Sequence, residues 1–174
     1  EKAREHFARD ERVLYYLGSL YDRQNKQDQA LALMNTILEV NPDNVQALNY
    51  IGYTYVARRE KLSDAEKMIR RAILLKPNDG YIQDSLGYLL LVRGQIKQAT
   101  IELEKALRLR PDEAVISEHL GDAYLRGNLK QKALQKYVDA AKLYSDPSDK
   151  EKVEKKIHEL QRILHSDRLP AQTK

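Results

Sequence analysis

The sequence predicts an all-α fold, namely a solenoid of stacked antiparallel helix pairs that ends in a C-terminal capping helix. Three observations support this prediction. Small and apolar residues recur four times at a period of 34 or 35 residues, apolar positions within each period return at helical spacing, and a proline stands near the end of each period. Periods of this length are typical of helical solenoids, in which each unit buries its apolar face against its neighbours.

The repeat is most visible in four glycines, which are spaced 34, 35 and 34 residues apart. Each glycine follows an aliphatic residue and is followed three positions later by tyrosine or leucine. Small residues recur further along each unit, and a proline closes it. The aligned positions are Gly18, Gly52, Gly87 and Gly121; Tyr21, Tyr55, Leu90 and Tyr124; Ala30, Ala65, Ala99 and Ala133; Ile37, Ala72, Ala106 and Ala140; and Pro42, Pro77 and Pro111, with Pro147 two positions late in unit four.

Each unit divides into two helices, here called A and B. In the third unit the apolar residues predict helix A over about residues 81–92 and helix B over about residues 96–109. The proline after helix B stops that helix, and the aspartate or asparagine that follows it can cap the next helix A. The turns between A and B contain residues that tolerate the left-handed conformation ending a helix: Asn25 in unit one, Gly94 in unit three, and Gly127 or Asn128 in unit four.

Gly87 lies among bulky residues in the middle of a predicted helix A. Glycine costs about 1 kcal/mol relative to alanine inside a helix, so its presence needs a reason. We predict that helix B of the same unit presses against helix A at this point, with Ala99 and Ala106 small for the same reason. A larger side chain at position 87 would overpack the contact, which costs about 1–3 kcal/mol.

This pattern, over about residues 11–147, resembles the tetratricopeptide repeat (TPR) family, of the type found in bacterial TPR proteins. The resemblance implies a right-handed α-solenoid. Gln83 and Ser117 depart from it, because the family has bulky residues at their positions. Residues 1–10 fit the end of a preceding helix B. The four units implied are residues 11–44, 45–79, 80–113 and 114–147.

The segment after Pro147 has one apolar stripe and is otherwise covered by Lys and Glu. An open solenoid end exposes apolar surface, which a terminal helix with a polar outer face can seal. We therefore expect a capping helix over about residues 148–168 and a tail at 169–174. A membrane-surface helix is the alternative, but such helices favour Lys and Arg alone on the polar face. The stripe consists of Val153, Ile157, Leu160 and Leu164.

Composition excludes several classes of protein. The formal net charge is +4, from 30 Lys and Arg against 26 Asp and Glu that are mixed along the chain, which favours a solvated surface over a nucleic-acid footprint. There is no cysteine and therefore no disulfide framework, which fits the cytoplasm and the periplasm or envelope equally. No run of 18 apolar residues occurs, so we expect no membrane insertion by this segment. A signal or lipid anchor would lie upstream.

No known catalytic motif is present, because the chain lacks HExxH, glycine-rich phosphate loops and GxSxG. None of the four histidines has a carboxylate at metal-ligand spacing, and His158 and His165 fit a solvated helix face. We therefore expect a non-enzymatic chain with no cofactor, metal site or catalytic residue. A catalytic domain outside this sequence remains an alternative.

The family resemblance implies that the A helices line a concave groove that receives a peptide or a partner helix. Six of the chain's 11 tyrosines fall at the groove positions, and tyrosine suits recognition because it combines large area with a polar tip. Some of these rings could instead only pad neighbouring A helices. The groove positions are Arg12, Tyr15, Tyr16, Ser19, Asn49, Tyr50, Tyr53, Val56, Tyr81, Asp84, Tyr88, Leu91, Glu118, His119, Asp122 and Arg126.

The same positions suggest the chemistry of the ligand. Family members that clamp a terminal carboxylate use Lys, Asn and Arg in the groove, and here only Asn49 fits such a clamp. Asp84, Glu118 and Asp122 instead bring negative charge. We therefore predict a protein segment with aromatic or aliphatic anchors and a few Lys or Arg side chains, whose binding weakens as salt rises.

Two other functions stay open at this point. The chain could self-associate into a homo-oligomer, for example in a bacterial envelope assembly. RNA binding is less favoured, because the phosphate backbone demands a basic track and the groove is acidic in unit four. The leading prediction is a non-enzymatic scaffold for protein–protein interaction.

Overall fold

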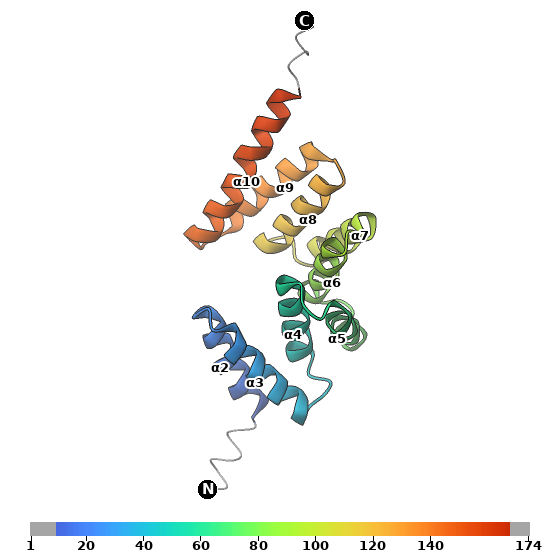
Figure 1. Ribbon diagram of the computed structural model, residues 1–174, viewed down its shortest axis with the longest axis vertical. Coiled ribbons are helices and arrows are strands. Elements are labelled where there is room, and N and C mark those ends of the chain that lie inside the picture. Colours follow the sequence, from blue (N-terminus) through green and yellow to red (C-terminus); the bar gives the residue numbers. More distant parts are fainter. Residues whose placement is uncertain (1–9, 168–174) are drawn as a thin grey trace, which may run out of the picture.

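The computed structural model describes residues 10–167, and these form nine α-helices and no strand. The helices stack as four antiparallel pairs followed by one longer helix, which confirms the predicted all-α solenoid (Figure 1). The segments expected to be a preceding helix end and a tail lie almost entirely outside the described residues. The pairs are α2 Glu11–Arg23 with α3 Gln27–Val40, α4 Val45–Arg58 with α5 Leu62–Leu75, α6 Gly80–Val92 with α7 Ile96–Leu109, and α8 Ala114–Arg126 with α9 Lys130–Leu143; the last helix is α10 Pro147–Ser166.

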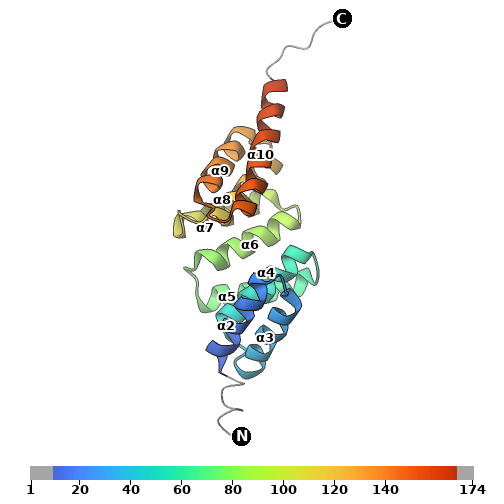
Figure 2. The same ribbon diagram turned by 90° about the vertical axis from the view of Figure 1, so that its left-hand side faces the viewer.

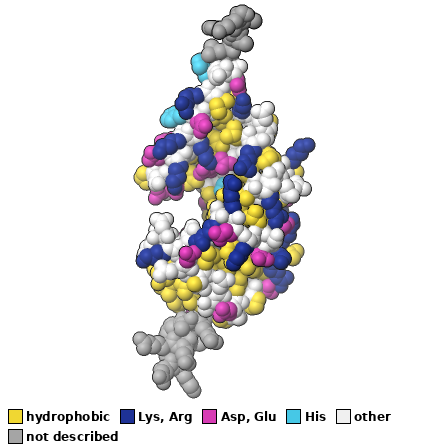
Figure 3. Space-filling view, in the orientation of Figure 1, with side chains coloured by type: hydrophobic (Ala, Val, Ile, Leu, Met, Phe, Trp, Pro, Cys, Tyr) yellow, Lys and Arg dark blue, Asp and Glu magenta, His cyan; other side chains and the backbone are white. Residues whose placement is uncertain are grey.

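The A helices, which are α2, α4, α6 and α8, follow one another along the stack, and α6 packs against both α4 and α8. Figure 2 looks onto this side and shows α6 crossing the middle of the molecule. The B helices α5 and α7 lie on the opposite side in Figure 1. The space-filling view has a notch between the end formed by α2 and α3 and the end formed by α8, α9 and α10 (Figure 3). The A helices thus face the hollowed side.

The glycines mark the closest approach of helices A and B, as predicted. A Cβ atom added to Gly87 would lie 2.5 Å from Leu103 Cγ, and one added to Gly121 would lie 2.6 Å from Tyr137 Cδ1. Leu103 therefore covers Gly87 itself. Ala99 and Ala106 are fully buried on the α7 side of the same unit.

The predicted turn chemistry holds with one correction, which concerns the helix caps. Asn25, Gly94 and Asn128 have positive φ, so in unit four the left-handed residue is Asn128, whereas Gly127 has a φ of −79°. The helix caps lie one position later than expected. Asn44 caps α4 and Asp79 caps α6, each by accepting a hydrogen bond from a backbone N–H of the first turn.

The final helix packs on α9 and buries Val153 and Leu160 of its apolar stripe. Asp146 caps it, and Pro147 is its first residue rather than the end of the fourth unit. Proline is common at the first helical position, where its missing N–H is not needed. His158 and His165 are exposed on this helix, as expected. None of the described helices is both long and apolar enough to cross a membrane.

Candidate partner-binding groove

A hollow of about 370 Å³ lies on the concave side, across all four A helices. We call it the tyrosine hollow, because four of its lining residues are tyrosines. Six of the predicted groove residues line it. Gln46, Asp79, Ser85 and Val115 also line it and were missed. The complete lining is Tyr15, Gln46, Asn49, Tyr50, Tyr53, Asp79, Tyr81, Asp84, Ser85 and Val115.

A second hollow of about 280 Å³ lies nearer the C-terminal ends of the A helices. The predicted groove residues Tyr88, Asp122 and Arg126 line it. Leu91, which was also predicted, lines it as well, and the six remaining predicted groove residues line neither hollow. The lining of the second hollow is Arg59, Tyr88, Leu91, Val92, Asp122, Leu125 and Arg126. The predicted groove residues that line neither hollow are Arg12, Tyr16, Ser19, Val56, Glu118 and His119.

Two of the four tyrosine hydroxyl groups of the first hollow donate their hydrogens to carboxylates outside it. Tyr50 Oη donates to Asp22 at 2.7 Å, and Tyr81 Oη donates to Glu113. Burial, followed by the hydrogen bond to Asp22, raises the pKa of Tyr50. These phenols are therefore neutral near pH 7 and present ring faces and oxygen lone pairs to the hollow.

Three aromatic rings form a ridge between the two hollows. The ring centroids of Tyr53 and Tyr88 are 5.7 Å apart, and the ring of Tyr88 stacks on that of His119 at 4.3 Å with an interplanar angle of 5°. Tyr53 lines the first hollow and Tyr88 lines the second. The two tyrosines occupy equivalent places in neighbouring A helices. Each ring therefore covers part of the surface of the other.

Asp84 is buried and pairs with His119, the buried ring of this ridge. His119 Nδ1 lies 2.9 Å from Asp84 Oδ1 and 3.1 Å from Oδ2. Burial lowers the pKa of His119, but the Asp84 carboxylate, followed by Asp122 and Glu118, outweighs burial and raises this pKa above its usual value. The predicted groove residue Asp84 is therefore already paired with another predicted groove residue within the chain.

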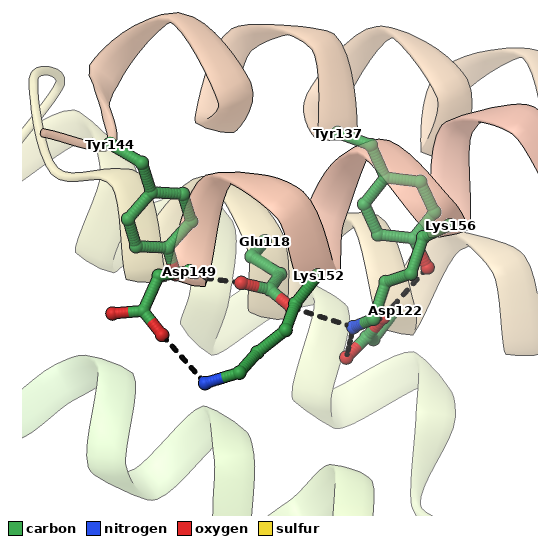
Figure 4. A network of polar contacts seen from close by, with 7 residues as sticks. All are labelled: Glu118, Asp122, Tyr137, Tyr144, Asp149, Lys152 and Lys156. Atoms are coloured by element: carbon green, nitrogen blue, oxygen red, sulfur yellow. Dashed lines mark hydrogen bonds and ion pairs between the residues drawn. The ribbon is translucent and has the colours of Figure 1, made fainter. Parts of the chain in front are cut away.

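The two other predicted acidic groove residues bind the capping helix (Figure 4). Lys156 of α10 places Nζ 2.8 Å from Glu118 Oε1 and 2.7 Å from Asp122 Oδ1. Tyr144 Oη donates to Glu118 at 2.6 Å, and Tyr137 Oη donates to Asp122 at 2.7 Å. Burial lowers the pKa of Lys156, but the two carboxylates outweigh it and raise this pKa. The negative charge of unit four is thus compensated within the chain.

The remaining predicted residues have varied surroundings. Arg12 is exposed and pairs with the capping carboxylate of Asp10 at 3.1 Å. Tyr16 is 64% exposed, and Ser19 Oγ donates to the carbonyl oxygen of Tyr15. Arg126 donates to the carbonyl oxygen of Leu91 at 2.7 Å, which connects α8 to α6. Residues 10–167 contain no group of three or more His, Asp or Glu side chains arranged to bind a metal ion.

A family model described as a tetratricopeptide repeat matches residues 15–81 and 85–150, which together make up more than half of the chain. The chain belongs to the tetratricopeptide repeat family. A TPR repeat-containing protein of Pseudomonas aeruginosa is 32% identical over 116 residues, which are 67% of this chain and 20% of that protein. The chain therefore spans about a fifth of the length of this relative.

Two solved structures have a fold similar to that of this chain. An O-GlcNAc transferase of Thermobaculum terrenum superposes with a TM-score of 0.69 at 25% identity, over 79% of this chain and 26% of that chain. YrrB, a TPR protein, superposes with a TM-score of 0.60 at 21% identity, over 86% of this chain and 76% of that chain. TPR domains are in general non-catalytic scaffolds for protein interaction, although some occur within enzymes.

Proposed function

We propose that this TPR chain is a non-enzymatic module that binds a peptide or helix of a partner protein in its concave groove. The observation that carries the proposal is the tyrosine hollow, in which Tyr15, Tyr50, Tyr53 and Tyr81 come together from three A helices. Tyrosine gives large contact area with few rotatable bonds. The solved YrrB structure is described as a TPR protein with an unusual peptide-binding site, which agrees with a groove ligand in this fold.

We propose that the ligand lies over units one to three, and the contacts of the acidic residues support this. Lys156 already pairs with Glu118 and Asp122, so a ligand cation in unit four would have to displace it. Tyr53 and Tyr88 are only half-buried and give the ligand an aromatic ridge to cross. We propose Tyr15, Asn49, Tyr50, Tyr53, Tyr81 and Tyr88 as the residues that contact it.

Affinity capture from a lysate of the source cells, followed by mass spectrometry, tests this proposal. The baits are the parent chain, Tyr15→Ala and Tyr53→Ala. Tyr16→Ala is a matched control, because Tyr16 lies beside Tyr15 on α2 and lines neither hollow. We expect a partner that the parent and the control retain and that the other two variants lose. A partner retained equally by all four baits would place the binding surface elsewhere.

Self-association is a second candidate function, and a specific observation favours it. Val13 and Leu17 of α2 are 37% and 41% exposed, whereas the equivalent Ala47 and Ile51 of α4 are fully buried. In unit two, α3 covers this face of α4. The equivalent face of α2 in unit one is apolar and partly exposed. Sedimentation velocity over a hundred-fold concentration range would detect association through this face. An unchanged monomer mass, or an association that Leu17→Glu leaves intact, would count against it.

A further inference from the structure

We propose that the tyrosine hollow binds the guanidinium group of an arginine side chain of the bound segment. This inference rests on the proposed function of the groove and specifies the chemistry of its ligand. It is carried by the polar groups that line the hollow, which present hydrogen-bond acceptors and aromatic faces.

The aromatic walls of the hollow attract a cation. Its lining includes four tyrosines and, among the described residues, no lysine, arginine or histidine. The face of an aromatic ring is negative and binds guanidinium groups within about 6 Å. One of these rings already does so within the chain, because Arg110 Cζ lies 4.9 Å from the centre of the Tyr81 ring. A second guanidinium would find further ring faces at Tyr15 and Tyr53.

Three of the hydroxyl groups that line the hollow already donate their hydrogens within the chain. The Tyr50 and Tyr81 hydroxyls donate to Asp22 and Glu113, and Ser85 Oγ donates to the Tyr81 carbonyl oxygen at 3.0 Å. Each of these oxygens keeps lone pairs that can accept. These oxygens therefore suit a ligand group that donates several hydrogen bonds.

Asn49 supplies the most specific acceptor. Its side-chain oxygen Oδ1 is buried and has no hydrogen-bond partner within the chain, although Asn49 lines the hollow. An unsatisfied buried acceptor is unfavourable, so a donor brought by a ligand gains more here than at an exposed oxygen. The carboxylates of Asp79 and Asp84 lie in the same lining, where Lys76 and His119 respectively pair with them. An anionic ligand would therefore meet two carboxylates and no cationic side chain among the lining residues.

Arginine fits this set better than lysine. The guanidinium is planar, has five N–H donors and no acceptor, and stacks on aromatic faces, whereas the lysine ammonium is a compact and strongly hydrated charge. One guanidinium could donate to Asn49 Oδ1 while its face lies against a tyrosine ring, once the Asn49 amide turns this buried oxygen toward the hollow. The neutral analogue citrulline has nearly the same shape but no charge, so it separates the contribution of charge from that of shape.

An NMR titration with single amino-acid derivatives tests the inference without knowledge of the partner. The probes are N-acetyl-arginine N-methylamide and the same derivatives of citrulline and lysine. We expect the arginine probe to bind saturably and to shift the resonances of the Asn49 side-chain amide and the Ser85 backbone amide. Since a cation–π contact contributes about 0.5–2 kcal/mol, citrulline should bind about ten-fold more weakly than arginine.

Two substitutions of the same residue act in opposite directions. Asn49→Leu removes the acceptor and should weaken arginine binding about five-fold or more, whereas Asn49→Asp adds a negative charge and should strengthen it. Asn35→Leu is the matched control, because Asn35 lies on α3 and its side chain bonds to the Leu31 carbonyl oxygen outside the hollow. If Asn49→Leu does not fold, Asn49→Asp and the citrulline probe still decide the question.

The inference is overturned if citrulline binds as tightly as arginine, or if neither Asn49 variant changes the affinity for arginine. It also fails if no arginine derivative binds although Tyr15→Ala and Tyr53→Ala lose a captured partner, and in that case the proposed function stands. If the arginine probe binds at Asn49 but both tyrosine variants retain every captured protein, the hollow recognises guanidinium while the groove is not where the partner binds.

Discussion

Gly87→Ala adds a single methyl group at the contact between helices A and B of unit three. The new Cβ would lie 2.5 Å from Leu103 Cγ and 3.2 Å from the Leu103 backbone nitrogen. Leu103 is fully buried, so its side chain has no free space into which to move. One helix must therefore shift slightly, or the leucine must leave its preferred rotamer.

Two opposing terms set the magnitude of this effect. Alanine stabilises a helix interior by about 1 kcal/mol relative to glycine. Overpacking a well-packed contact costs about 1–3 kcal/mol. We therefore expect Gly87→Ala to lower the free energy of unfolding by about 1 kcal/mol, and Gly87→Val to lower it further. Gly127→Ala is the control, because the nearest atom to its new Cβ is the Ala123 carbonyl oxygen at 3.3 Å and its φ is negative, so its effect should be smaller.

Urea unfolding followed by circular dichroism measures these differences, with the m-value checked because repeat arrays can depart from two-state behaviour. A double-mutant cycle with Leu103→Ala isolates the cause. Leu103→Ala alone should cost about 2–5 kcal/mol, and in its background Gly87→Ala should become neutral or stabilising because the atom it meets is gone. A stabilising Gly87→Ala in the parent, or an equal cost in both backgrounds, would refute the packing argument.

Three further predictions concern charge and capping. Lys156→Met leaves Glu118 and Asp122 without their shared counterion and should destabilise the chain by about 1–2 kcal/mol at pH 7, a figure reduced from that of a buried pair because Lys156 is partly exposed. Urea unfolding at pH 7 checks this, and an unchanged free energy of unfolding would contradict it. Because the pKa of His119 is raised on folding, protonated His119 stabilises the folded chain fully below about pH 6.5, and this stabilisation is lost as pH rises through the folded-state pKa. The free energy of unfolding, measured from pH 6 to pH 8.5, should therefore decline, and His119→Gln should reduce this decline. Asn44→Ala removes the cap of α4 and should cost about 1 kcal/mol in urea unfolding, so an unchanged midpoint would count against the cap.

The helix pairs and their glycine contacts could be predicted because they depend on residues close in sequence. The spacing of Gly87 from Ala99 and Ala106 already indicates which faces of helices A and B meet. The caps were misplaced by one residue, since Asp and Asn occur at successive positions in these loops and either can cap. The left-handed residue of unit four was narrowed only to Gly127 or Asn128, because both residue types tolerate that conformation.

The ion pairs of the groove join residues of different units. The sequence pattern indicates such contacts less directly than it indicates the contacts within one unit. Asp84 and His119 are 35 residues apart, close to one period, so they lie on adjacent A helices. That spacing was a usable signal. Lys156 had no such signal, because it belongs to α10, which departs from the repeat consensus. Without knowing how α10 packs, Glu118 and Asp122 appear as free carboxylates.

The same stacking divides the groove into two chemically different halves. Equivalent positions of successive A helices lie side by side, so Asn49, Asp84 and Glu118 form one row along the concave side. The row begins with an unpartnered amide oxygen, continues with a carboxylate paired to His119, and ends with a carboxylate bound by Lys156. Unmet hydrogen-bonding capacity is therefore greatest towards unit two and declines towards the capping helix. If the groove binds a partner segment as proposed, hydrogen-bond donors of that segment would gain most at the Asn49 end, where the tyrosine rings gather. The gradient would then favour one orientation of the segment.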